Sequence, residues 1–136
     1  MTHVLLVGGD VALLEGLAQS LAAQGHAPAV ASSLGEARDL AMTEPPLVLV
    51  VSRALASSAG AELLAIPLAA GGARLLYRAA NVPLAPLLPA LQRSVLADLT
   101  LPLERHRLSA LVQSLDERAR ATGRSLRPTP PDNRAQ

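Results

Sequence analysis

Five consecutive aliphatic residues at positions 47–51 constrain the fold more than any other stretch of this sequence. The run Leu-Val-Leu-Val-Val follows Pro45 and Pro46 and precedes Ser52. The two prolines stop any helix from entering the run, because each ring removes an N–H donor and restricts the residue before it. A run this short and uninterrupted predicts a strand that is buried on both faces, as in the middle of a parallel sheet.

Four more short apolar runs predict the remaining strands, at residues 4–7, 27–31, 74–77 and 95–100. Helical patterns separate the strands. The first helix follows Asp10, and the second runs from the capping box of Ser33 and Glu36 to about residue 42. A third around 61–69 is weakened by Pro67, a short or kinked one lies within 86–94, and the last ends at Gly123. Strands that alternate with helices predict a doubly wound parallel sheet with helices on both faces. Residues 1–122 would form this domain, and the proline-rich residues 123–136 a disordered tail or linker.

Composition excludes several classes of function. The 136 residues include no cysteine, so disulfides and thiol chemistry are excluded, and all twelve basic residues are arginine, so no mechanism can use a lysine ammonium. A net charge of +1 gives little electrostatic reason to expect nucleic acid as a partner. No apolar stretch approaches the roughly 20 residues of a membrane span, and we expect a cytoplasmic protein without membrane contact.

The candidate site lies at the carboxyl ends of the strands, where open parallel sheets bind their ligands. Gly8 and Gly9 after the first strand could hold a phosphate on a helix N-terminus, although a tight turn explains them better. Arg78 and Arg53 could form an anion site, but we favour an ion pair of Arg78 with Asp10.

Nucleophilic catalysis and metal binding have little support in the sequence. Ser52 has no visible general base, because none of the three histidines is expected at this edge. His3, His26 and His106 also lack the spacing of metal ligands.

The order of these elements resembles the receiver domain of bacterial two-component response regulators, over about residues 3–120. Three stretches carry the resemblance: residues 4–7 with the helix that follows, the run 45–50, and residues 97–103 with the junction of Leu101 and Pro102. The resemblance implies a flavodoxin-like fold with a five-stranded sheet in the order 2-1-3-4-5.

The resemblance also implies that the phosphorylation chemistry of receivers is lost. Receivers transfer a phosphoryl group to an aspartate with the help of Mg²⁺ and a lysine. Position by position, the parts of that site correspond to the following residues here: the acidic pair to Gly8 and Gly9 with Asp10 just beyond, the phosphoacceptor to Val51 followed by Ser52, the hydroxyl residue to Arg78, the lysine to Leu101, and the aromatic switch residue to Asp98 or Leu99. We therefore expect a degenerate pseudo-receiver that is not an enzyme and that uses no metal or cofactor.

Such a module would act through contact with a protein partner or a second copy of itself. In the family this contact often uses a face that corresponds here to residues 86–93, 95–100 and 104–118. On the last helix we expect the interaction surface to comprise Glu104, Arg105, Gln113, Asp116 and Arg118. The alternative is a sensor that binds an anion or a nucleotide over Gly8, Gly9, Ser52 and Arg78, and a paired Arg78 would favour the contact module over the sensor.

Overall fold

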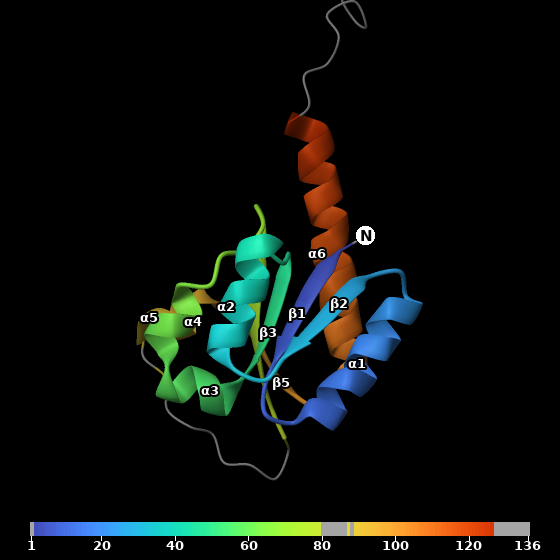
Figure 1. Ribbon diagram of the computed structural model, residues 1–136. Coiled ribbons are helices and arrows are strands. Elements are labelled where there is room, and N and C mark those ends of the chain that lie inside the picture. The colour runs from blue at the N-terminus through green and yellow to red at the C-terminus, as the bar shows by residue number, and fades with distance from the viewer. Residues whose placement is uncertain (1, 80–86, 88, 127–136) are drawn as a thin grey trace, which may run out of the picture.

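Five parallel strands form one sheet in the order β2-β1-β3-β4-β5 (Figure 1). The strands are β1 (His3–Val7), β2 (Ala27–Ala31), β3 (Val48–Ser52), β4 (Ala73–Arg78) and β5 (Val95–Thr100). This computed structural model describes residues 2–79, 87 and 89–126, with residues 122–126 described by their backbone alone. The predicted fold and strand order are confirmed. The aliphatic run lies in the central strand β3, where residues 48–51 are fully buried.

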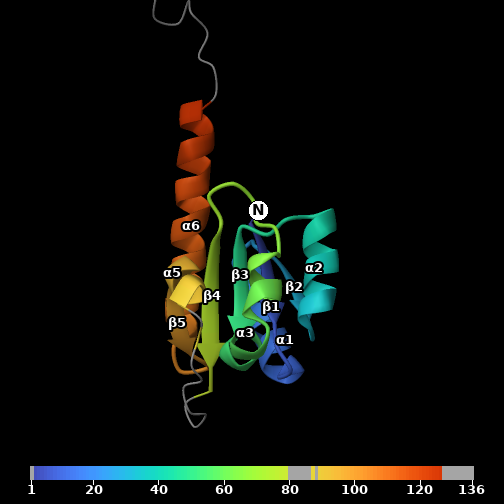
Figure 2. The ribbon, with the colours of Figure 1, turned by 90° about the vertical axis from the view of Figure 1, so that its left-hand side faces the viewer.

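Helices cover both faces of the sheet (Figure 2). They enclose two apolar cores, one on each face. On one face lie α1 (Val11–Ala23) and α6 (Arg105–Leu126), and on the other lie α2 (Leu34–Thr43), α3 (Arg53–Ser58), α4 (Gly60–Leu64) and α5 (Pro89–Ser94). Alternate residues of each strand enter opposite cores, because successive side chains of a strand point to opposite faces. Leu6 and Val50 thus enter the core under α1 and α6, and Val7 and Val51 enter the core under α2, α3 and α5.

The polar residues predicted to begin the first two helices do so. The carboxylate of Asp10 accepts a hydrogen bond from the Leu13 N–H at 3.4 Å, and the hydroxyl of Ser33 accepts one from the Glu36 N–H at 3.1 Å. Glu36 accepts a hydrogen bond in return, from the N–H of Ser32 rather than from that of Ser33. Each contact satisfies an N–H that a helix start leaves without an intrahelical partner.

Between β3 and β5 the helices are shorter than the sequence predicts. The expected helix around residues 61–69 is wrong in its bounds: two short helices, α3 and α4, follow β3 directly, and α4 ends at Leu64. Pro67 explains the early end, because its ring disfavours a helical conformation in the residue before it. The helix expected within 86–94 begins at Pro89, and residues 80–86 and 88 lie outside the described part.

The last helix is longer than expected. We predicted that Gly123 would end it, but α6 continues to Leu126. A glycine inside a helix costs only about 1 kcal/mol relative to alanine, and it ends a helix reliably only in the left-handed conformation that Gly25 adopts after α1, with φ 91°. The tail predicted from residue 123 therefore does not begin there, and residues 127–136 lie outside the description.

α6 runs antiparallel to the strands and extends beyond the end of the sheet at which they begin (Figure 2). None of the helices described above has both the length and the apolar composition that a membrane crossing requires.

Candidate functional site

The strand register brings most of the predicted site residues to one edge of the sheet. Val7 lies beside Val51, Ser52 beside Tyr77, and Arg78 beside Thr100. Gly8 and Gly9 follow β1 directly, and the N–H of Leu101 donates a hydrogen bond to the carbonyl of Arg78 at 2.9 Å. We call this end of the sheet the carboxyl edge.

Val51 occupies the phosphoacceptor position that the resemblance indicates, and its side chain is fully buried. Its exposed fraction is 0%, and it packs in the core that α2 and α3 cover. A valine side chain has no lone pair to offer a phosphoryl group or a metal ion. Ser52, the next residue, is only half-buried, and its side chain does not cap α3.

Tyr77 occupies the space directly above Gly8. A Cβ atom at position 8 would collide with the hydroxyl oxygen of Tyr77, whereas a Cβ at Gly9 would meet no atom within 4 Å. The two glycines therefore differ: the close approach of Tyr77 leaves no room for a side chain at position 8, whereas position 9 has room for one. Burial and, secondarily, the charge of Asp10 raise the pKa of Tyr77 to about 12, so the phenol is neutral at physiological pH.

Sequence reasoning did not include Tyr77 in the site. Two signals could have indicated it. It is the only aromatic residue in the chain, and it stands one position before Arg78, near the end of β4. Its neighbour in register is Ser52, so its ring reaches across the end of β3 toward the loop after β1.

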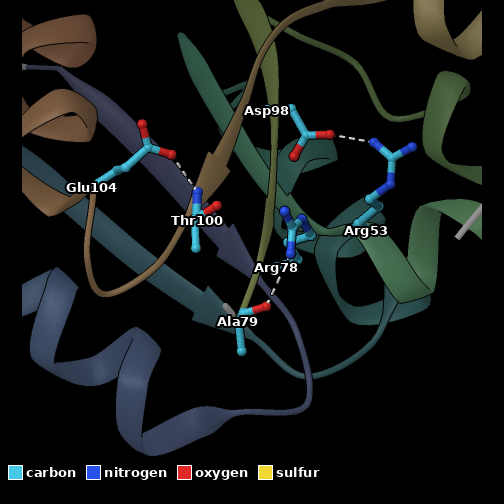
Figure 3. A network of polar contacts seen from close by, with 6 residues as sticks. All are labelled: Arg53, Arg78, Ala79, Asp98, Thr100 and Glu104. Atoms are coloured by element: carbon cyan, nitrogen blue, oxygen red, sulfur yellow. Dashed lines mark hydrogen bonds and ion pairs between the residues drawn. The ribbon is translucent and has the colours of Figure 1, made fainter. Parts of the chain in front are cut away.

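Arg53 and Asp98 form an ion pair that crosses the carboxyl edge (Figure 3). Arg53 is the first residue of α3 and its side chain is only 11% exposed, while Asp98 lies on the edge strand β5. Because β4 separates β3 from β5, the pair links the start of α3 to a strand two positions away. The sequence placed Arg53 among the candidate anion ligands and Asp98 near the aromatic switch position, but it did not pair them.

The ion pairs of the described residues do not include the expected pair of Arg78 with Asp10. Asp10 instead caps α1, and Nη1 of Arg78 lies 3.5 Å from the carbonyl oxygen of Ala79, to which it donates a hydrogen bond (Figure 3). Glu104 accepts a hydrogen bond from the Thr100 N–H at 2.7 Å. That contact, then Arg107, and finally the more distant charge of Arg78 lower the pKa of Glu104. The charge of Arg78 thus acts on Glu104, the residue just before α6.

The five residues expected on the outer side of α6 do not share one face. Thirteen residues separate Arg105 from Arg118, which places them about 140° apart around a helix of 3.6 residues per turn. Glu104 is bonded to β5 through Thr100, whereas Asp116 accepts a hydrogen bond from the hydroxyl of Thr2, just before β1.

Asp116 is not part of an outer surface at all, because only 6% of it is exposed. Burial alone would raise the pKa of Asp116, but the Thr2 hydroxyl and Arg120, whose guanidinium lies 3.1 Å from the carboxylate, lower it overall. Its place in the predicted interaction surface is therefore wrong. Arg105, Gln113 and Arg118 are exposed, and Glu104 is half-buried.

Metal-binding geometry is not found at this edge. No group of three or more histidine, aspartate or glutamate side chains in the described part of the chain lies close enough to hold one ion.

The strand order and the two helical layers define the flavodoxin-like class of α/β folds. Within that class, the similar solved structures are receiver domains of response regulators. One from Clostridium thermocellum superposes with a TM-score of 0.69 at 15% identity, over 90% of this chain and 99% of that chain. A putative response regulator from Chloroflexus aurantiacus gives a TM-score of 0.65 at 20% identity, over 84% of this chain and 96% of that one.

A third similar structure is a response regulator protein from Burkholderia pseudomallei with a phosphorylated aspartic acid, a calcium ion and citrate. It gives a TM-score of 0.63 at 18% identity, over 95% of this chain and 76% of that one. No family model and no curated protein match the sequence itself. At these identities the likenesses establish the fold, and the chain has the fold of a receiver domain.

Proposed function

We propose that this chain is a receiver-like signalling module that is not phosphorylated on aspartate and that acts by binding another protein in the cytoplasm. The receiver fold supports a role in signalling. The residues at the carboxyl edge support the loss of phosphorylation, and the surface around β5 supports protein contact.

The burial and identity of Val51 carry the proposal. Phosphorylation of an aspartate requires a carboxylate oxygen that attacks the phosphorus atom, together with acidic groups that hold Mg²⁺ beside it. In this chain the acceptor position is a fully buried valine, and Gly8 and Gly9 bring no carboxylate. The lysine that would stabilise the transferred group corresponds to Leu101, which is also fully buried.

Asp10 and Asp98, two carboxylates near this edge, have other partners. Asp10 accepts from the first turn of α1, and Asp98 is paired with Arg53. A phosphoryl group on either one would have to replace these contacts. We infer that the Arg53–Asp98 pair holds this edge in one arrangement, in place of a phosphorylation-dependent switch.

The surface next to the edge strand β5 is the best candidate for protein contact. Leu96 on β5 is 50% exposed and Leu103, in the turn that follows, is 73% exposed. Glu104 follows Leu103 in the chain and accepts a hydrogen bond from the N–H of Thr100, the last residue of β5. Its angular position, counted along α6, is within about 40° of that of the exposed Arg118. Exposed apolar side chains with charges at their border are typical of protein interfaces. We call Leu96, Leu103, Glu104 and Arg118 the β5 surface.

The test of lost phosphorylation is incubation with acetyl phosphate and Mg²⁺, followed by intact-mass measurement. A receiver that carries the acceptor aspartate serves as the positive control. We expect no added phosphoryl group on this chain under conditions that modify the control. A stoichiometric adduct that maps to Asp10 or Asp98 would contradict the proposal.

The alternative function, an anion or nucleotide sensor at the same edge, has less support. A sensor needs cationic groups that can receive the anion. Arg53 is held by Asp98, and Arg78 donates a hydrogen bond to the carbonyl oxygen of Ala79. Tyr77 also occupies the space above Gly8 in which a phosphate would approach the start of α1.

A further inference from the structure

A groove separates α2 from α4 on the face of the sheet opposite α6. Its volume is about 490 Å³, and it is lined by Leu34, Gly35 and Arg38 of α2, by Ala61 and Glu62 of α4, and by Ala65 just after α4. Three of these six residues are glycine or alanine, so the groove has room for side chains from another molecule. The groove is unrelated to the carboxyl-edge residues described above.

The groove carries one cation, Arg38, and one anion, Glu62. Arg38 and Glu62 are both exposed, and neither side chain makes a hydrogen bond or an ion pair with any other residue in the described ranges. They line the same groove from two different helices, and they are not among the ion pairs of the described residues. Each is available to an opposite charge on a second molecule.

Met42 extends the same side of α2 with an apolar side chain. It follows Arg38 by four residues, which places the two side chains next to each other on the helix surface. Met42, in the last turn of α2, is 70% exposed. Methionine adapts its shape to irregular partner surfaces, so it suits a contact beside a groove.

We propose that this groove is the interface of a homodimer with two-fold symmetry, in which Arg38 of each copy pairs with the partner's Glu62. A two-fold interface requires a surface that is complementary to itself: when one residue contacts a second residue across the axis, the reverse contact must also form. A cation on one wall of the groove and an anion on the other meet that condition: Arg38 of each copy can pair with Glu62 of the other, so two equivalent ion pairs form. The proposed dimer goes beyond the proposed function, since it uses a surface on the other face of the sheet from α6.

Mixing two charge-reversed variants tests this pairing directly. Arg38→Glu places a glutamate opposite the partner's Glu62, and Glu62→Arg places an arginine opposite the partner's Arg38, so each variant alone has like charges across the axis. A heterodimer of the two variants has two opposite-charge pairs again. By sedimentation velocity, we expect the parent chain to dimerise and each single variant to dissociate at least about tenfold more readily. An equimolar mixture should recover the parent's dimerisation.

Matched controls separate this interface from general charge effects and from the β5 surface. Glu15→Arg and Arg118→Glu make the same changes of net charge at exposed positions outside the groove, and we expect both variants to dimerise like the parent. Circular dichroism checks that all variants fold. A parent chain that stays monomeric, single variants that dimerise normally, or a mixture that stays monomeric would each overturn the proposed interface. If dimerisation is lost in Arg118→Glu but kept in the groove variants, copies of the chain associate through the β5 surface instead, which overturns this inference and leaves the proposed function standing.

Discussion

The phenol of Tyr77 lies so close above Gly8 that position 8 cannot accept even a Cβ atom without a collision at the hydroxyl oxygen. Tyr77 comes from β4 and Gly8 follows β1, so the ring crosses the end of the central strand β3. The only aromatic side chain of the protein therefore fills the place at which the resemblance puts the first acidic residue of a phosphorylation site. Restoring an acidic residue there would require the ring to move.

This contact predicts different effects for two adjacent glycines. Gly8→Ala should destabilise the fold by about 1–3 kcal/mol, in the range for overpacking. Gly9→Ala is the matched control and should change stability by less than about 0.5 kcal/mol, because its Cβ would meet open space. Urea denaturation measures both. Tyr77→Phe, which removes the colliding oxygen, should recover part of the loss in the Gly8→Ala background, and an unchanged loss would argue against this contact.

Restoring a carboxylate at the acceptor position should damage the fold without restoring phosphorylation. Val51→Asp should cost about 1–3 kcal/mol at neutral pH, because it places an unpaired polar group in a fully buried site. Burial raises the pKa of such a carboxyl, so the loss should be smallest in acid and should grow as the pH rises through the normal range of aspartate. Val51→Asn, of similar shape and without a charge, should show no such dependence in urea titrations. A Val51→Asp variant as stable as the parent at neutral pH would mean that position 51 is accessible to water.

The contribution of Tyr77 to stability can be measured between pH 10 and 12. The raised pKa of about 12 means that the folded state favours the neutral phenol more than the unfolded state does, where the value is near 10. The stabilisation is complete below pH 10 and should be lost between pH 10 and 12 as the unfolded chain ionises first. With one tyrosine, no lysine and no cysteine, the chain has no other phenol and no ammonium or thiol side chain that titrates in this window. Tyr77→Phe should therefore flatten the stability curve there, and ultraviolet absorbance of the tyrosinate should locate the midpoint in the folded parent.

The Arg53–Asp98 pair should contribute more to stability than the exposed pair of Arg107 and Glu104. Arg53 is almost completely buried, so Asp98→Asn leaves a guanidinium with little access to water, and we expect a loss of about 1–2 kcal/mol. Arg107→Gln on the surface should cost at most about 0.5 kcal/mol. A double-mutant cycle of Arg53→Gln with Asp98→Asn measures the pair itself. A coupling energy near zero would remove the pair as a constraint on the carboxyl edge.

The β5 surface can be tested without knowledge of the partner. Leu96→Glu combined with Arg118→Glu should abolish the capture of proteins that the parent chain retains from its native cell extract. Arg105→Glu with Gln113→Glu alters exposed residues elsewhere around α6 and should leave the capture intact. Thermal unfolding should be nearly unchanged in both, because all four positions are exposed. If the Arg105 and Gln113 variant loses the partner and the Leu96 and Arg118 variant keeps it, the contact surface has been assigned to the wrong side of the helix.

The fold was predictable from the sequence because it depends on patterns that are local in the chain. The run at 47–51 determines a strand on its own, and the capping residues Asp10 and Ser33 each determine the start of a helix. The alternation of strands and helices then determines the class of sheet. The predicted ends of helices were wrong where a residue type that often ends a helix did not do so. Gly123, for example, was expected to stop α6, but it lies inside a helix that continues for three more residues.

The partners of side chains at the site were less predictable, because they depend on distances between residues that are far apart in the sequence. Arg53 and Asp98 are 45 residues apart, and Asp116 and Thr2 are 114 apart. The sequence identified Arg53, Arg78, Asp10 and Asp98 as residues of one edge, but charge alone does not decide which arginine pairs with which carboxylate. The pairing depends on how the strands align in the sheet, and that alignment is known only from the packed structure.

The reach of α6 has a mechanical consequence. The helix is held to the sheet near its start through Glu104 and Thr100, and again in its middle through Asp116 and Thr2. From Ala119, which still packs against the core, to Leu126 the helix continues for roughly 10 Å, at 1.5 Å per residue, and it extends beyond the end of the sheet (Figure 2). That segment acts as an arm: a slight tilt of α6 about its contact near Ala119 moves the far end by a distance that grows with the length of the arm.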